Sequence, residues 1–106
     1  MGTDDSLIKA IENAAQQTGE RVWHLPLPDE YRSQLDSNIA DVKNIGSNWG
    51  GALTAGLFLK EFVSEGIPWA HLDIAGPAFA DAAWGEHPKG GTGFGVRLLI
   101  DLVENF

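Results

Sequence analysis

The most apolar stretch of the sequence is Gly50-Gly-Ala-Leu-Thr-Ala-Gly-Leu-Phe-Leu-Lys-Glu-Phe-Val63, and it decides how the chain must fold. Its apolar residues fall on nearly every side of a helix, and its only charged residues, Lys60 and Glu61, come late. A helix that is apolar almost all round needs cover on most of its sides. We therefore predict a helix over residues 50–63 that packs inside a larger structure.

The residues after this helix predict a strand, a loop and a last helix. Trp69 to Ala75 alternates between apolar and polar residues, which is the pattern of a half-buried strand. A loop rich in Gly, Ala and Pro follows from Gly76 to Gly91, and loops of this length are usually functional or disordered. The last helix is expected from Thr92, as its cap, to about Asn105. Its buried side would hold Val96, Leu99, Ile100 and Val103.

The residues before the apolar helix predict three further elements and an extended piece. Thr3 to Gln17 reads as a helix capped by Thr3. Its apolar face would hold Leu7, Ile8, Ile11, Ala14 and Ala15. Val22 to Leu25 predicts a short strand, and Pro28 suits the first position of a short helix. Asp41 to Gly46 is expected to be extended.

The predicted fold class is α/β, but incomplete, with about four helices and two or three short strands. A parallel α/β sheet needs cover on both faces and usually has more strands than this. The apolar helix has no evident sheet of its own to pack on. We therefore interpret the chain, residues 1–106, as a portion of a larger α/β domain with no internal domain boundary.

Composition excludes several classes of function. The chain is 43% hydrophobic and 21% charged, an ordinary globular balance. Its formal net charge of −8 repels phosphate backbones, so we expect no nucleic-acid partner. No apolar run reaches the roughly 20 residues that span a bilayer, so we expect no membrane partner. Because the chain has no cysteine, disulfides and thiolate metal sites are excluded.

Two residue patterns could carry chemistry, each with a simpler structural interpretation. His71 and Asp73 stand two apart on the predicted strand and, with His24 or His87, could ligate a metal. A polar strand face that hydrogen-bonds to its neighbours is the favoured interpretation, because a lone His-x-Asp is a weak signal. The glycines before the last helix could bind an anion on backbone N–H groups, but a turn that needs positive φ is favoured there too. These glycines are Gly90, Gly91, Gly93 and Gly95.

The aromatic residues could form a binding surface for carbohydrate or peptide, although such residues are more often core or interface anchors. They are Trp49, Trp69, Trp84, Phe79 and Phe94. No serine lies in a Gly-x-Ser-x-Gly elbow, so a hydrolytic triad is not indicated.

Several motifs together resemble the C-terminal part of the catalytic domain of the leucyl aminopeptidase (cytosol aminopeptidase) family. They are Gly19-Glu-Arg-Val-Trp23, Leu25-Pro-Leu27, Ala40-Asp-Val-Lys-Asn-Ile-Gly46, Ala52-Leu-Thr-Ala-Gly-Leu-Phe-Leu-Lys-Glu-Phe62, Trp69-Ala-His-Leu-Asp-Ile-Ala-Gly76 and Gly90-Gly-Thr-Gly-Phe-Gly-Val-Arg-Leu-Leu99. Their order is that of the family, and the resemblance covers almost the whole chain.

The resemblance implies a metal-dependent exopeptidase that removes N-terminal residues, often leucine, from peptide substrates. Family members use two divalent cations, zinc or manganese, to activate water and polarise the scissile carbonyl. They assemble as homo-hexamers in the cytoplasm. The family's metal ligands and catalytic residues, including those of the motif Asn-Thr-Asp-Ala-Glu-Gly-Arg, lie upstream and have no counterpart here. The resemblance therefore assigns no catalytic residue and no metal ligand to this chain, which is predicted to be inactive alone.

The resemblance does assign part of a substrate pocket. In the family, the residues after the Leu-Asp-Ile-Ala-Gly strand line the pocket for the first side chain of the substrate. Here these residues are Ala75, Gly76 and Ala78, and their small size would leave room for leucine. Simple packing of the two alanines is the open alternative. A second hypothesis for the whole chain is a non-catalytic interaction or assembly module derived from the family.

Overall fold

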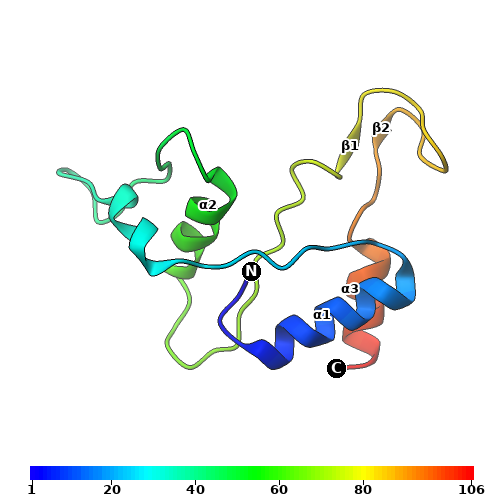
Figure 1. The fold of residues 1–106 in the computed structure, drawn as a ribbon, viewed down its shortest axis with the longest axis horizontal. Coiled ribbons are helices and arrows are strands. Elements are labelled where there is room, and N and C mark those ends of the chain that lie inside the picture. Colours follow the sequence, from blue (N-terminus) through cyan, green and yellow to red (C-terminus); the bar gives the residue numbers. More distant parts are fainter. The chain divides into compact units, whose positions relative to one another are not determined.

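A computed structural model describes all 106 residues of the chain. It contains four helices, α1 (Asp5–Thr18), the 3-10 helix η1 (Asp29–Leu35), α2 (Gly51–Lys60) and α3 (Val96–Glu104). Two short strands, β1 (Phe79–Ala80) and β2 (Gly90–Gly91), complete it (Figure 1). The four helices and two short strands confirm the predicted fold class, an incomplete α/β fold. No helix has the length and apolarity needed to cross a membrane.

The chain divides into two compact units. The first comprises Met1–Ile8 and His24–His71, and the second comprises Lys9–Trp23 and Leu72–Phe106. Helix α1 begins in the first unit and continues in the second. The prediction of a single domain without an internal boundary stays a prediction.

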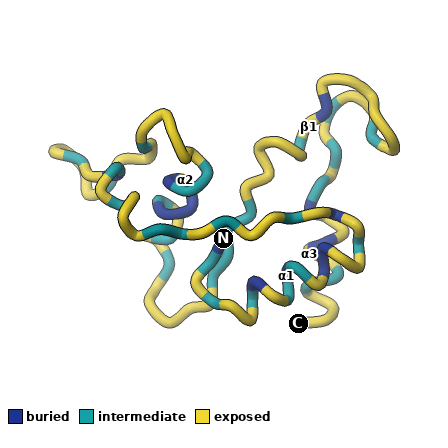
Figure 2. Tube along the Cα trace, viewed as in Figure 1, coloured by how far each residue is buried: buried dark blue, intermediate teal, exposed yellow.

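In the first unit, α2 packs against η1. Leu35 at the end of η1 is 0% exposed and Leu57 of α2 is 2% exposed, so both belong to this small core. Figure 2 shows buried positions along α2. The side chain of Arg32 joins the two helices at the surface, because its Nε donates to Glu61 Oε1 at 2.5 Å. This hydrogen bond is the main cause that raises the pKa of Arg32 above its usual value. Helix α2 is shorter than the predicted 50–63, since it ends at Lys60.

The predicted strand from Trp69 to Ala75 is wrong. Only Ala70 pairs, in a single antiparallel bridge with Gly2. Hydrogen bonds on either side of this bridge join Thr3 N–H to the carbonyl of Trp69 and His71 N–H to the carbonyl of Met1, both at 2.9 Å. A strand needs a neighbour along its whole length, and this segment has one for about three residues.

The other predicted extended pieces have no strand partner either. Val22 to Leu25 is irregular, so the predicted strand there is wrong. The stretch from Asp41 to Gly46 bends at residues 41, 42 and 44, so it is not extended throughout. The strands instead lie within the predicted loop of 76–91. There β1 and β2 pair antiparallel, with Phe79 opposite Gly91 and Ala80 opposite Gly90. Period-2 patterning could not reveal β2, because two glycines carry no side chain to alternate.

Helix α1 agrees closely with the sequence. Ile8, Ile11, Ala14 and Ala15 are buried, and Gly19 adopts a φ of +74° just after the helix. The predicted cap was wrong by one residue, because the side chain of Asp4 accepts the N–H of Leu7 at 2.7 Å. Thr3 instead pairs with Trp69.

Helix α3 begins at Val96 with Gly95 as its N-cap, three residues later than the predicted cap at Thr92. Its buried residue is Leu98, which is 0% exposed. The prediction of a buried face is wrong for this chain, since all four residues of that face are about half exposed or more. They are Val96, Leu99, Ile100 and Val103. The helical spacing of these residues is real, but no other segment of the chain covers them.

Gly46 lies where a larger residue would collide with α2. A Cβ atom at this position would lie 2.8 Å from Cγ2 of Thr54, which is buried and branched at its own Cβ. We predict that Gly46→Ala lowers the free energy of unfolding by about 1–3 kcal/mol, because such a side chain has little freedom to give way. Urea unfolding would measure the loss.

Gly51→Ala is the matched control within the same unit. A Cβ atom there would meet nothing within 4 Å, and alanine favours a helix by up to about 1 kcal/mol over glycine. This variant should be unchanged or slightly more stable. Equal effects of the two substitutions would contradict the close approach of Gly46 to Thr54.

Candidate functional site

The predicted pocket wall forms a tight turn in the second unit. The side chain of Asp73 accepts the N–H of Ala75 at 3.0 Å, and Ala78 N–H donates to the carbonyl of Ile74 at 3.0 Å. Ala75 and Gly76 are exposed, whereas Ala78 is half-buried. A Cβ atom on Gly76 would meet nothing within 4 Å, so the space beside this residue is open. The turn therefore presents three small residues without obstruction.

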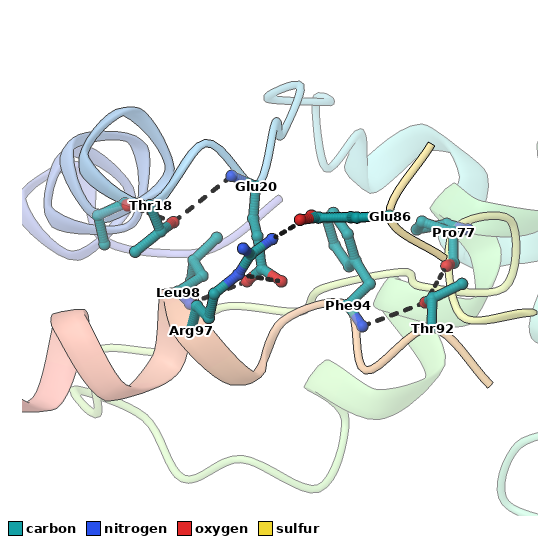
Figure 3. A network of polar contacts seen from close by, with 9 residues as sticks. Thr18, Glu20, Pro77, Glu86, Thr92, Phe94, Arg97 and Leu98 are labelled. Carbon is teal, nitrogen blue, oxygen red and sulfur yellow. Dashed lines mark hydrogen bonds and ion pairs between the residues drawn. The ribbon is translucent and has the colours of Figure 1, made fainter. Parts of the chain in front are cut away.

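Thr92 binds the C-terminal end of this turn (Figure 3). Its hydroxyl donates to the carbonyl of Pro77 at 2.5 Å, and its backbone N–H donates to the carbonyl of Ala78 at 3.0 Å. The second bond lies directly beside the Phe79–Gly91 pair of the hairpin, so Thr92 continues the pairing of β1 with β2. Two consecutive carbonyls of the candidate wall are thus bound by one residue.

A buried carboxylate lies at the N-terminus of α3. Glu20 is 5% exposed, and its Oε2 accepts the N–H of Leu98 at 2.9 Å. Leu98 is the third residue of α3, where the N–H groups of a helix lack partners within the helix. The negative charge also suits the positive end of the helix dipole. Glu20 therefore caps a helix that is 78 residues away in sequence.

Arg97 extends this contact toward the hairpin. Its Nε lies 3.7 Å from Glu20 Oε1, and its Nη2 lies 3.2 Å from Glu86 Oε1 (Figure 3). Glu86 stands between the two strands, in the connection from β1 to β2. Both Arg97 and Glu86 are largely exposed, so this second pair is worth little energy by itself. The buried carboxylate of Glu20 should contribute more to stability than the exposed pair of Arg97 with Glu86.

The histidines do not gather around a metal. His71 stacks beside Trp69, with ring centroids 6.3 Å apart, and His87 lies beside Trp84 at 4.9 Å. The carboxylate of Asp73 is engaged by the N–H of Ala75. No group of three or more His, Asp or Glu side chains is arranged to hold a metal ion. The residues present therefore do not fit a two-cation centre.

The glycines before α3 fit the turn interpretation. Gly90, Gly93 and Gly95 have φ values of +120°, +71° and +93°, which side chains rarely adopt. At the helix N-terminus, the N–H of Leu98 is already bound by Glu20, so the chain supplies its own anion there. The aromatic residues do not form a core, since Trp49, Trp84 and Phe79 are mostly exposed.

Sequence reasoning missed both Glu20 and Thr92 as anchors of the site. Glu20 lies in the Gly-Glu-Arg-Val-Trp motif, but its partner cannot be deduced from local spacing. The prediction that Thr92 caps α3 is wrong, because the N-cap is Gly95 and no side chain caps the helix from that position. The hydroxyl of Thr92 instead accepts the N–H of Phe94 at 3.2 Å, before the helix begins. Its other bonds reach back across the hairpin to the turn.

We predict that Glu20→Ala lowers the free energy of unfolding by about 1–3 kcal/mol, because Leu98 N–H loses its acceptor in a buried place. Glu20→Gln keeps an acceptor oxygen and should lose less. Glu12→Gln is the control, since Glu12 pairs only with Lys9, at 3.6 Å on the surface of α1, and should change stability by no more than about 0.5 kcal/mol. Urea unfolding that shows Glu20→Ala as mild as the control would contradict the capping role.

Comparison with curated proteins finds relatives that are much longer than this chain. A probable cytosol aminopeptidase from Streptomyces avermitilis is 55% identical over 105 residues, which are 98% of this chain and 20% of the relative. One from Aquifex aeolicus is 53% identical over 94 residues, 88% of this chain and 19% of the relative. The chain thus spans about a fifth of the length of the curated relatives it matches.

Solved structures give the same result. The structure of the bottromycin maturation enzyme BotP in complex with Mn matches 96% of this chain and 23% of its own, with a TM-score of 0.90 and 44% identity. A cytosol aminopeptidase from Coxiella burnetii matches 99% of this chain and 23% of its own, with a TM-score of 0.86 and 38% identity. A mutant of tomato leucine aminopeptidase matches 96% of this chain and 19% of its own, with a TM-score of 0.85 and 38% identity.

The family match covers nearly the whole chain. Residues 1–100 match the catalytic domain of the cytosol aminopeptidase family. This chain therefore belongs to the cytosol aminopeptidase family and represents part of its catalytic domain.

Proposed function

We propose that this chain supplies scaffold and a wall of the substrate pocket in a metal-dependent leucyl aminopeptidase. The parent enzyme would remove N-terminal amino acids from peptides, as a homo-hexamer in the cytoplasm. The observation that carries the proposal is the family match over residues 1–100, with relatives 55% identical. The 106 residues alone would be inactive, because the family's chemistry is assigned to residues upstream.

The proposed cofactor is a pair of divalent cations, zinc or manganese, held by residues outside this chain. A relative that is 44% identical has been solved in complex with Mn, which supports the manganese alternative. Within this chain, no side-chain cluster fits such ions. We therefore assign no step of metal chemistry to these residues, and limit their role to shaping the place where the substrate lies.

The turn from Ile74 to Ala78 is the proposed contact for the first side chain of the substrate. Ala75, Gly76 and Ala78 are small, and the space beside Gly76 is open. Apolar surface of this kind favours a large apolar side chain. Each methylene group that gains or loses contact with such a pocket changes the free energy that separates two substrates by about 1–3 kcal/mol. The bonds from Asp73 and Thr92 hold the backbone of the turn, so the wall has a defined position.

The alternative function is a non-catalytic interaction or assembly module derived from the same family. The exposed apolar face of α3 is the observation that favours it, because such a face generally meets a partner. A module of this kind would still use the core and the Glu20 cap. It would have no use for a pocket wall, so substitutions at Ala78 separate the two functions.

We predict that Ala78→Trp in the full-length protein reduces kcat/KM for leucyl substrates far more than for alanyl substrates. The indole would fill the space that the leucine side chain needs, while alanine would still find some room. The informative quantity is the ratio of the two kcat/KM values, measured by steady-state hydrolysis on protein shown to be folded. A loss of about tenfold or more in that ratio corresponds to one or two lost methylene contacts.

Ala82→Trp serves as the control. Ala82 is exposed and lies in the connection between β1 and β2, away from the turn. Its substitution should leave the ratio unchanged. If Ala78→Trp lowers both activities in equal proportion, Ala78 packs against its neighbours and does not line the pocket. If the full-length protein hydrolyses neither substrate, the alternative function gains support.

A further inference from the structure

We infer that Thr92 is a positioning residue for the pocket wall, and that its hydroxyl helps to set the preference for large over small first side chains. The inference rests on the proposed function, because it concerns the same turn. Thr92 is not placed against the reacting atoms. It acts through Pro77 and Ala78, whose carbonyls it binds.

The hydroxyl of Thr92 is fixed in its direction by a second bond. It donates to the carbonyl of Pro77 at 2.5 Å and accepts the N–H of Phe94 at 3.2 Å (Figure 3). A hydroxyl that both donates and accepts has little freedom to rotate toward water. Because the adjacent backbone N–H binds the carbonyl of Ala78 at 3.0 Å, Thr92 holds two consecutive peptide groups of the wall at once.

Thr92 is itself held on both sides. Gly91, the residue before it, pairs with Phe79 in the hairpin. On its other side, α3 begins at Val96, and Glu20 fixes that helix through Leu98 N–H at 2.9 Å. Thr92 can hold the turn only if Thr92 itself is held in place. The buried carboxylate of Glu20 contributes to this, because it binds the N-terminus of the helix that follows Thr92 in sequence. The anchoring thus runs from Glu20 through α3 to Thr92.

Without the hydroxyl, the turn keeps its other bonds. Ala78 N–H still donates to the carbonyl of Ile74, and Thr92 N–H still donates to the carbonyl of Ala78. The wall would therefore loosen without unfolding. One neutral hydrogen bond is worth about 0.5–1.5 kcal/mol, or about twofold to tenfold in an equilibrium. A large substrate side chain depends on more contact with the wall than a small one does, so it should lose more.

The test compares three variants of the full-length protein with the unmodified one. Thr92→Val removes the hydroxyl with little change of shape, and Thr92→Ser retains it. Thr54→Val is the matched control, because the hydroxyl of Thr54 also donates to a backbone carbonyl, that of Gly51 at 3.1 Å in α2. The substrates are leucyl and alanyl peptides, and KM and kcat are determined separately for each.

Thr92→Val should lower the leucyl-to-alanyl ratio of kcat/KM by about threefold to tenfold, mainly by raising KM for the leucyl peptide. Thr92→Ser and Thr54→Val should keep the ratio of the unmodified protein. A folded, active Thr92→Val protein with an unchanged ratio would overturn the inference while leaving the proposed function intact. An unmodified protein that cleaves neither peptide would overturn the proposed function and, with it, this role of Thr92.

If Thr92→Val fails to fold, two further measurements still test the inference. Thr92→Ala also lacks the hydroxyl and gives a second measurement of the ratio. Hydrogen exchange on the unmodified protein adds a readout without any substitution. The amides of Thr92 and Phe94 should exchange more slowly than those of exposed residues in the hairpin connection. Exchange of both amides at the rate of an unstructured chain would overturn the inference. It would show that the hydrogen bonds from Thr92 N–H to Ala78 and from Phe94 N–H to the Thr92 hydroxyl do not form.

Discussion

The hydrogen bond from Leu98 N–H to the buried carboxylate of Glu20 joins parts of the second unit that are far apart in sequence. A carboxylate that is 5% exposed would be costly to bury without compensation. The unpaired N–H groups and the positive dipole end of α3 supply that compensation, with Arg97 as an additional opposite charge. Thr92 lies four residues before the start of α3, and its hydroxyl and N–H bind the carbonyls of Pro77 and Ala78 in the turn.

Local rules predicted the helices well, because helices are built from local contacts. Helix α1 was predicted within two residues at each end, and Gly19, just after it, has the positive φ typical of a glycine that follows a helix. The strands were not predictable in this way. Pairing depends on a neighbour from elsewhere in the chain, and Ala70 finds one only at Gly2. The true strands are two residues long, one of them only glycine.

In the candidate site, too, some features could be predicted from the sequence and others depend on contacts between distant residues. Resemblance to the family selected Ala75, Gly76 and Ala78, and the structure describes them as a turn held by Asp73 and Thr92. What the sequence could not reveal is what holds the turn. Glu20 and Leu98 are 78 positions apart, and no periodicity connects them. Their role follows only from the three-dimensional arrangement of the second unit.

Helix α3 carries information about the longer protein. Its apolar spacing predicts a buried face, yet Val103 is 76% exposed and Val96 56%. Apolar residues at this spacing are typical of a helix face that is covered. This chain spans about a fifth of the length of its curated relatives. The exposed face is therefore consistent with a segment whose remaining contacts lie in the other parts of the catalytic domain.

The most direct test of this account is the hydrolysis of a leucyl peptide by the 106-residue chain alone, with manganese or zinc supplied, beside the full-length protein. We predict a rate at background for the chain and a clear rate for the full-length protein, because the proposed role of this segment is to shape the pocket and not to supply the chemistry. A rate above background that survives repurification of the isolated chain, and that Ala78→Trp abolishes, would contradict it.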